Sequence, residues 1–575
     1  MESARLNGDA LAALLRVARG DAPADLVIRN ARVVNVRTLE IETLDLAIAE
    51  GRIAGLGGYE GHTVLDAQGA YAAPGLIDPH IHVESSMLSP AQFARAVVPK
   101  GTAAVIWDPH EFANVLGVAG VEYVLRAADG LPLDLLVMLP SCVPATHLET
   151  SGVQLTAADL APFFGRPHVL GLGEVMNYPG VVAGDPGYLA KIRAAGGRPI
   201  DGHAPGLSGR ALCAYIAAGP NSEHESVRLE EAMEKLRRGM LVLAREGTVA
   251  ENLATLIPLV RRADAWEVAM CSDDRHPLDL WHEGHLDHHL RKAVSLGVDP
   301  LIALRAVTYT PARHYGLTDR GELVPGQRAD VVLFEDLQAF HAVRVFKDGR
   351  EVARDGQLLV DTPEFPPPTR ASVHLPADFR PDFTVPAEST RVRAIEIVPG
   401  QIITQQVIAE APRSDGALAA DPAGDLLKMA VIDRHSGQGG FAVGFLRGLG
   451  LRRGAIASTI AHDSHNVVVA GTNDADMRAA VAEIARIEGG QVVAAGGTVL
   501  AALPLPIAGL VSDRPLEEVA AGAARVRAAV RELGASLPDP FMSLAFLALP
   551  VIPELRLTDR GLVDVAAFRF VSVYA

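Results

Sequence analysis

Short apolar runs alternate with helical stretches through the middle of the chain. TAAVIW, DLLVML, VLGLGEV and VAMCS have the character of buried strands, whereas PAQFARAVVPK, GVEYVLRAA and PGYLAKIRAAG have helical character. Alternation of this kind over roughly 240 residues predicts a parallel sheet, and the length suits a (β/α)₈ barrel. We therefore predict an α/β fold with a TIM barrel over residues 74–319.

The segments that flank this region have a different pattern. ADLVIRNARVVNV and DLAIAEGRIAGLG near the start, and ADVVLFEDLQAFHAVRVFKDGREVARDGQ much later, are β-branched runs separated by Gly, Asn and Asp. This pattern is typical of a small antiparallel sheet. We predict that residues 1–73 and 320–362 form one composite β-sandwich domain, which begins with an amphipathic N-terminal helix.

The last third of the chain is predicted to be separate from the barrel. Residues 363–388 are rich in proline and are predicted to be a linker. Residues 389–575 contain strand-like runs and several helices, so we predict a C-terminal α+β domain. Its GLGLRRG segment does not match GxGxxG, which argues against a dinucleotide site.

Composition narrows the classes of function. The chain has 575 residues, 49% of them hydrophobic, and a formal net charge of -17. This acidic balance argues against nucleic acid or an anionic membrane as the main partner. We find no signal pattern and no apolar run of 18 residues. The three scattered cysteines fit a reducing compartment, so a cytoplasmic protein is expected.

Two histidines one residue apart follow the apolar run AAPGLI, within DPHIHVESS at residues 78–86. Side chains alternate faces in an extended segment, so His80 and His82 point the same way, about 7 Å apart. Two neutral imidazoles at a strand end can bind one metal ion. The alternative is a pair of surface histidines in a loop.

Other polar residues lie at or near the ends of apolar runs further along the barrel region. These are Glu174, His203, His224 and Asp273. Each alone could be a cap, a turn residue or a buried polar group with a partner. Because the active site of such barrels lies at the carboxyl ends of the strands, their ordered spacing favours one joint metal site.

Three motifs supply further candidates. WDPHEF contains Asp108, His110 and Glu111, which are either acid–base groups or the cap of a helix N-terminus. SEHES contains Glu223 and Glu225, which either orient His224 or begin a helix. Asp274 is expected to orient loops or substrate rather than bind metal, because adjacent side chains of an extended segment face opposite ways.

Two histidine-rich segments allow several interpretations. IAHDSHN places His462, Asp463 and His465 together, as an extra metal site, a loop that closes over the barrel, or a polar turn. HEGHLDHH lacks the spacing of HExxH, and its histidines at 282, 285, 288 and 289 are predicted to lie on a solvated helix face.

GLIDPHIH followed by His, His and SD in this order resembles the amidohydrolase superfamily, whose members are metal-dependent hydrolases on a (β/α)₈ barrel. PGLIDPHIHVESSMLSP, WDPHEFANV, GLGEVMNYPGV, DGHAP, SDDRHP and IAHDSHN together resemble the bacterial adenine deaminases. This resemblance spans nearly the whole chain, including the third domain. It implies hydrolytic deamination of adenine to hypoxanthine and ammonia in purine salvage.

The resemblance also implies a centre of two divalent metal ions. His80, His82 and Asp273 would bind one ion, His203 and His224 the other, and Glu174 would bridge them where many relatives use a modified lysine. Mn²⁺ or Fe²⁺ is favoured by the resemblance, and the donors also suit Zn²⁺. Asp273 would transfer protons, and Glu111 or Asp108 would protonate N1 of adenine, with His110 beside them.

Other functions remain open at this point. Cytosine deaminase-like and dihydroorotase-like relatives share the barrel and its ligands, and a non-enzymatic scaffold is a further alternative. The zinc deaminases of nucleic-acid bases are excluded, since the chain has no PCxxC motif. The expected partners are adenine and water, with no nucleic acid and no membrane, and we expect a homodimer or larger assembly.

Overall fold

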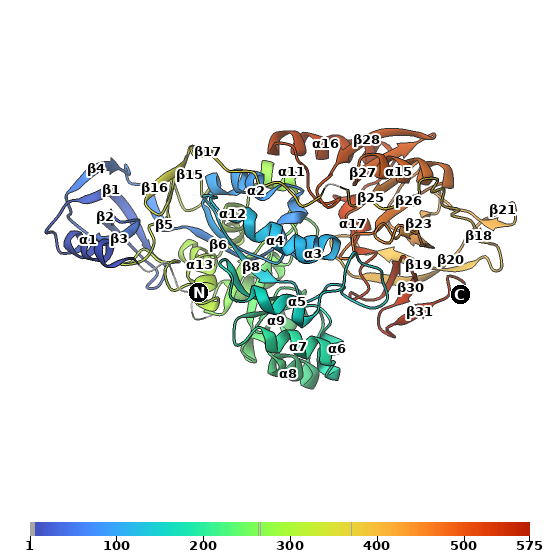
Figure 1. Ribbon diagram of the computed structural model, residues 1–575, viewed down its shortest axis with the longest axis horizontal. Helices are drawn as coiled ribbons and strands as arrows, with labels where there is room; N and C mark the ends of the chain where they lie inside the picture. The colour runs from blue at the N-terminus through green and yellow to red at the C-terminus, as the bar shows by residue number, and fades with distance from the viewer. Residues whose placement is uncertain (1–5, 263, 265, 370) are drawn as a thin grey trace.

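The computed structural model describes residues 6–262, 264, 266–369 and 371–575. A sheet built from both flanks of the barrel lies at one end of the elongated molecule, the barrel lies in the middle, and the C-terminal region lies at the other end (Figure 1). Within the described residues, no helix combines the length and apolar character needed to cross a bilayer.

The central region is a closed barrel of parallel strands. Its strands, in chain order, are β6 (Leu76–Ile81), β7 (Thr102–Trp107), β8 (Asp134–Leu139), β9 (Val169–Val175), β10 (Ile200–Gly202), β11 (Ser222–Glu223), β12 (Leu241–Arg245) and β13 (Val268–Cys271).

Neighbouring strands pair in sequence order, as β6 to β10 and as β11 to β13. The two arcs meet where the Asn221 amide donates to the Ile200 carbonyl at 2.9 Å, and where Asp273 bridges in parallel to Ile81. The barrel is therefore closed, and all its strand carboxyl ends share one rim.

Helices surround the barrel: α2 (Pro90–Val97), α3 (His110–Leu116), α4 (Val118–Ala127), α5 (Ala157–Leu160), α6 (Tyr178–Ala183), α7 (Pro186–Ala194), α8 (Gly209–Ala218), α9 (Leu229–Arg237), α10 (Leu253–Val260), α11 (Pro277–His282), α12 (Leu286–Ser295), α13 (Pro300–Ala306) and α14 (Tyr309–His314). Side-chain caps such as Ser89, Asp185 and Asp299 accept backbone amides at helix starts.

Strands from both flanks form one nine-stranded sheet: β1 (Ala24–Asn35), β2 (Glu40–Ala49), β3 (Arg52–Leu56), β4 (Gly61–Asp66), β5 (Tyr71–Pro74), β14 (Val331–Phe334), β15 (Ala342–Lys347), β16 (Arg350–Arg354) and β17 (Gln357–Leu358). β14 pairs antiparallel with β5, which joins the flanks. The amphipathic helix α1 (Gly8–Ala18) buries Leu14 and Val17 against this sheet.

The C-terminal region has an eight-stranded sheet: β19 (Arg391–Ile397), β20 (Thr404–Glu410), β23 (Leu426–Ile432), β24 (Phe441–Arg447), β25 (Ala455–Ser458), β26 (Val467–Gly471), β27 (Gly490–Ala495) and β28 (Thr498–Pro504). Smaller sheets contain β18 (Val385–Pro386), β21 (Arg413–Ser414) and β22 (Ala417–Leu418), and β29 (Leu555–Thr558), β30 (Gly561–Asp564) and β31 (Arg569–Val571). Its helices are α15 (Asp474–Arg486), α16 (Leu516–Glu532) and α17 (Pro540–Phe546).

The C-terminal region packs directly on the barrel rim. The Asn466 side chain donates to the Thr150 carbonyl at 2.8 Å, and the Thr558 hydroxyl donates to the Leu148 carbonyl at 2.7 Å. One apolar cluster joins residues of the loops after β8, β9 and β12 with residues of α17 and the segment after it. The open end of the barrel is thus covered by another part of the same chain.

Candidate metal centre

Six polar side chains converge where the barrel strands end. His80 lies in β6 and Glu174 lies in β9. His82, His203 and His224 directly follow strands, and Asp273 lies two residues after β13. Each is at most 4% exposed. They come together because parallel strands in a closed barrel present their carboxyl ends at one rim.

Backbone contacts fix the ends of the first and last barrel strands. The Asp273 amide donates to the His80 carbonyl at 3.0 Å, and the His82 amide donates to the Asp273 carbonyl at 3.3 Å. Asp273 has a φ of 57°, in the left-handed region that aspartate tolerates better than most residues. Asp78 accepts the amides of His80 and Ser272, which ties the two strands together behind the site.

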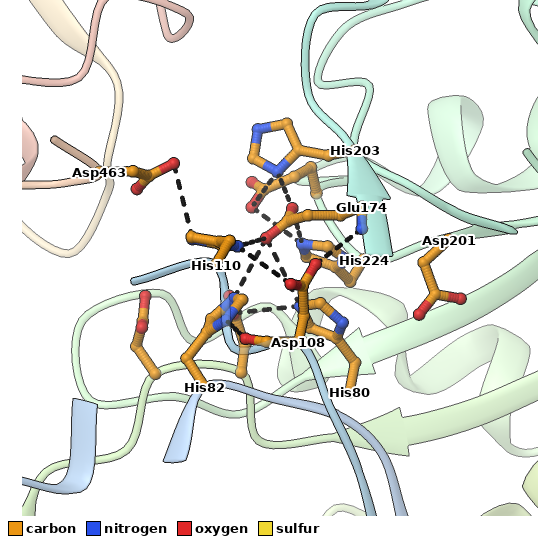
Figure 2. A network of polar contacts seen from close by, with 12 residues as sticks. His80, His82, Asp108, His110, Glu174, Asp201, His203, His224 and Asp463 are labelled. Carbon is orange, nitrogen blue, oxygen red and sulfur yellow. Dashed lines mark hydrogen bonds and ion pairs between the residues drawn. The ribbon is translucent and has the colours of Figure 1, made fainter. Parts of the chain in front are cut away.

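The Glu174 carboxylate lies between two pairs of imidazoles (Figure 2). One of its oxygens lies 3.1 Å from Nε2 of His82 and 3.9 Å from Nε2 of His80. The other lies 2.6 Å from Nδ1 of His203 and 3.3 Å from Nε2 of His224. A carboxylate in this position can contact two cations at once.

Asp273 completes the first of these groups. Its Oδ1 lies 3.1 Å from Nε2 of His82 and 3.5 Å from Nε2 of His80. His80, His82 and Asp273 therefore present three donor atoms to one point, and so do His80, Glu174 and His224.

The charges of this cluster are strongly coupled. Burial alone would lower the pKa of His224, but Glu174, Asp273 and Glu225 outweigh it and raise that pKa to about 9. Burial opposes ionisation of Glu174, yet the surrounding histidines hold its pKa well below the usual range. Without cations, the carboxylates thus favour the protonated form of His224.

Several buried nitrogens also lack a hydrogen-bond partner within the described structure. These are Nδ1 and Nε2 of His80, Nε2 of His203 and Nδ1 of His224. Buried polar atoms are seldom left without partners in folded proteins, so these nitrogens are expected to bind a group other than the described residues. The donors are imidazoles and carboxylates, which fit divalent transition metals.

Arg245, which the sequence analysis did not single out, holds two carboxylates beside this cluster. It is the last residue of β12 and only 2% exposed. Its guanidinium donates to both Glu225 oxygens, at 2.5 and 2.9 Å, and to Oδ2 of Asp273. Burial opposes ionisation of Asp273, but Arg245 and the histidines hold its pKa well below the usual range. A polar residue at the end of the apolar run LVLA was the available signal.

The structure places Asp108 and His110 in the same network. Oδ2 of Asp108 accepts the Glu174 amide at 2.8 Å, and Nδ1 of His110 lies 3.6 Å from the Glu174 carboxylate. Pro109 is the N-cap of α3, with no side-chain cap bond, so Asp108 does not cap that helix. These two residues face the site.

Glu111 lies beside this network and faces the C-terminal region. Its carboxylate accepts a hydrogen bond from the Ser85 hydroxyl at 3.1 Å, and the same hydroxyl lies 2.5 Å from Oδ1 of Asp274. Burial raises the pKa of Glu111, and the repulsion from Asp274 adds to this. Glu111 is therefore biased toward its protonated form.

The SEHES acids hold the neighbouring structure. Glu223 accepts the Ala204 amide at 3.0 Å and pairs with the buried Lys235 at 2.9 Å, but it does not contact a ring nitrogen of His224. Glu225 approaches Nε2 of His224 at 3.5 Å and is held by Arg245. Neither acid begins a helix, since α9 starts at Leu229.

The IAHDSHN loop of the C-terminal region contacts residues of the barrel rim. Nε2 of His110 lies 3.6 Å from Asp463, and Nδ1 of His462 lies 3.5 Å from Glu111. Nε2 of His465 lies 3.9 Å from the second Glu111 oxygen. The loop therefore covers the site and is not a solvent-exposed turn. Glu111, His462 and His465 also lie close enough together to hold a cation.

The prediction for HEGHLDHH is wrong for two of its four histidines. His282 is exposed and His288 is partly exposed, but His285 and His289 are fully buried. Nε2 of His285 lies 2.9 Å from Asp78, and its Nδ1 pairs with the Thr102 hydroxyl. Helix α12 begins only at Leu286, so His285 points inward behind the first barrel strand.

The barrel and this cluster together have the form of an amidohydrolase, and the model of the amidohydrolase family matches residues 71–352. The model of the adenine deaminase C-terminal domain matches residues 401–569. An adenine deaminase of Desulfatibacillum aliphaticivorans is 47% identical over 564 residues, 98% of this chain and 99% of the relative. Adenine deaminase 2 of Carboxydothermus hydrogenoformans is 50% identical over 562 residues, 97% of this chain and 99% of the relative.

Among solved structures, a D-hydantoinase aligns with a TM-score of 0.45 at 16% identity, covering 59% of this chain and 97% of that one. The two relatives that align over nearly the full chain are much more similar in sequence, at 47% and 50% identity. The chain belongs to the adenine deaminase family of amidohydrolases.

Proposed function

We propose that this chain hydrolyses adenine to hypoxanthine and ammonia. The observation that carries the proposal is the convergence of four imidazoles and two carboxylates at one barrel rim, in a chain that matches adenine deaminases along nearly its whole length. The C-terminal domain shared with that family supplies the loop that covers the cluster.

We assign the cluster as a site for two divalent cations. His80, His82 and Asp273 would hold one cation, and His203 and His224 the other. Glu174 would bridge the two cations. This assignment is supported by its two oxygens, which face separate pairs of imidazoles. Mn²⁺ or Fe²⁺ is our preferred pair, with Zn²⁺ also compatible with the donors. Bound cations of this kind make water nucleophilic near neutral pH and stabilise developing negative charge.

Asp273, besides holding a cation, and Glu111 would transfer the protons of the reaction. Water adds to C6 of adenine, N1 gains a proton, and the amino group leaves as ammonia. Asp273, which Arg245 helps keep ionised, would take the proton of the water and deliver it to the leaving nitrogen. Glu111, which burial biases toward the protonated form, is our choice for the donor to N1, and it would regain its proton from the C6 hydroxyl as the carbonyl of hypoxanthine forms.

We further propose three properties of the whole protein. The domains follow the boundaries 1–73 with 320–362, 74–319 and 389–575, with a linker at 363–388 and a β-sandwich as the first unit. The enzyme acts in the cytoplasm, which its three unpaired cysteines support. It assembles as a homodimer or larger.

Ammonia release from adenine, adenosine and cytosine by the purified protein tests this function. His82→Ala should abolish release from adenine and lower the metal content, because one imidazole serves both Glu174 and Asp273. The exposed His282 offers a matched control, and His282→Ala should keep both properties. Full activity in the His82 variant would refute the site.

A further inference from the structure

The cavity above the ligand cluster has two chemically different parts. Most of its lining is polar and comes from the barrel rim and the IAHDSHN loop. The apolar part consists of Met176 from the barrel, and Phe546, Leu549 and Ile552 from the C-terminal domain. We call these last three residues the roof.

The roof is buried and closely packed. Phe546 is 7%, Leu549 2% and Ile552 0% exposed. They belong to one apolar cluster with Met176 and Cys142 of the barrel. The cavity volume is about 20 Å³, which is room for one or two water molecules. Adenine occupies more volume than this, so side chains that line the cavity must shift when it binds.

Arg556 fixes the backbone that carries the roof. This guanidinium is fully buried, and Nε donates to the Ile552 carbonyl at 2.7 Å while Nη1 donates to the Phe546 carbonyl at 3.0 Å. Nη2 donates to the carbonyls of Ile402 and Pro553 at 2.7 and 3.1 Å. Any shift of the roof backbone would leave buried donors of a charged group unpaired, so the roof resists displacement.

The orientation of a bound purine follows from the proposed function, on which this inference rests. C6, its amino group and N1 must lie at the polar part of the cavity. N9 belongs to the five-membered ring at the opposite end of the purine, which leaves that end to the apolar part. A substituent on N9 would meet the roof, and the hydroxyls of a ribose would find no polar side chain among the described roof residues.

We propose that Leu549 and Ile552, held in place by Arg556, determine specificity for purines without a substituent at N9. The roof acts in two ways, since it limits the volume available beyond the five-membered ring and offers no hydrogen-bond partner to a sugar. 9-Methyladenine separates these effects, because it adds volume without hydroxyls.

The test compares kcat/KM for adenine, 9-methyladenine and adenosine, with metal content measured in every variant. Leu549→Ala should raise the ratio of 9-methyladenine to adenine at least about tenfold, since a few methylenes of pocket shape change specificity by that amount. Adenosine should gain less, because its hydroxyls stay unpaired. Ile552→Val removes one methylene and should raise the same ratio by a smaller factor. It serves as the test variant if Leu549→Ala does not fold.

Leu544→Ala is the matched control. Leu544 lies on α17, is fully buried and does not line the cavity, so its truncation should leave the ratio unchanged. If the ratio of kcat/KM for 9-methyladenine to that for adenine is the same in the wild type and both roof variants, and adenine is still deaminated, the proposed role of the roof is refuted while the proposed function stands. A wild-type protein that releases no ammonia from adenine would instead overturn the proposed function.

Discussion

Replacing Arg245 with methionine isolates the electrostatic support of the site. Methionine has a similar length but no charge and no hydrogen-bond donor. In the wild type, the guanidinium binds Glu225 through two nitrogens and Asp273 through one. All three side chains are at most 4% exposed, so water cannot replace the lost partner.

The structure sets the size of the effect. Removing one partner of a buried ion pair typically costs about 3–5 kcal/mol, because the other charge is left uncompensated. For a cooperative unit the size of the barrel, this corresponds to a fall in Tm of about 6–20 °C in the metal-free protein. Bound cations would compensate Asp273 but not Glu225, so the fall should be smaller in the metal-loaded protein.

Differential scanning calorimetry of metal-free and metal-loaded Arg245→Met, beside Arg245→Lys, measures both effects. Lysine keeps the charge but loses the fork that holds Glu225, so its Tm should lie between those of the wild type and the methionine variant. An unchanged Tm for metal-free Arg245→Met would refute the reasoning. An equal fall in Tm of Arg245→Met with and without metal would also refute it.

Two further predictions concern Glu111 and the ion pair between His276 of the barrel region and Asp539 of the C-terminal region. Glu111→Gln should lower kcat by about 10² to 10⁴ with metal content intact; an unchanged kcat would move the role to Asp108 or elsewhere. Asp539→Asn should lower Tm most between about pH 4 and 6.5. In the wild type, burial lowers the pKa of His276, but the contact with Asp539 outweighs it and raises that pKa. His276 in turn lowers the pKa of Asp539 to about 2, against the effect of burial. The ion pair is therefore lost when pH rises through the raised pKa of His276 or falls through the lowered pKa of Asp539. A Tm difference that does not vary with pH would contradict this.

The barrel and the six central residues could be predicted because their signals are local. TAAVIW is β7 and VLGLGEV is β9, at the residues where the apolar runs stand. Once those strands are parallel, their polar exits must meet at one rim. Arg245 ends such a run too, but a guanidinium is not a metal ligand, so a pattern of ligand residues does not include it.

The features that sequence reasoning missed depend on contacts between distant segments. His285 shares the charged neighbourhood of an exposed helix, yet it is buried by Asp78 and Thr102, which lie far away in the chain. The loop at His462 could be a turn, a lid or a metal site until its contacts with Glu111 are known. No periodicity carries that information.

The pairing of β5 with β14 has a consequence for synthesis. β5 ends at Pro74 and its partner starts at Val331, so the ribosome must add roughly 260 residues before the ladder can form. At about 5–20 residues per second, this takes roughly 15–50 s. During that interval the nascent N-terminal sheet has an unpaired, aggregation-prone edge. Chaperone demand should therefore be greatest while the barrel is being translated.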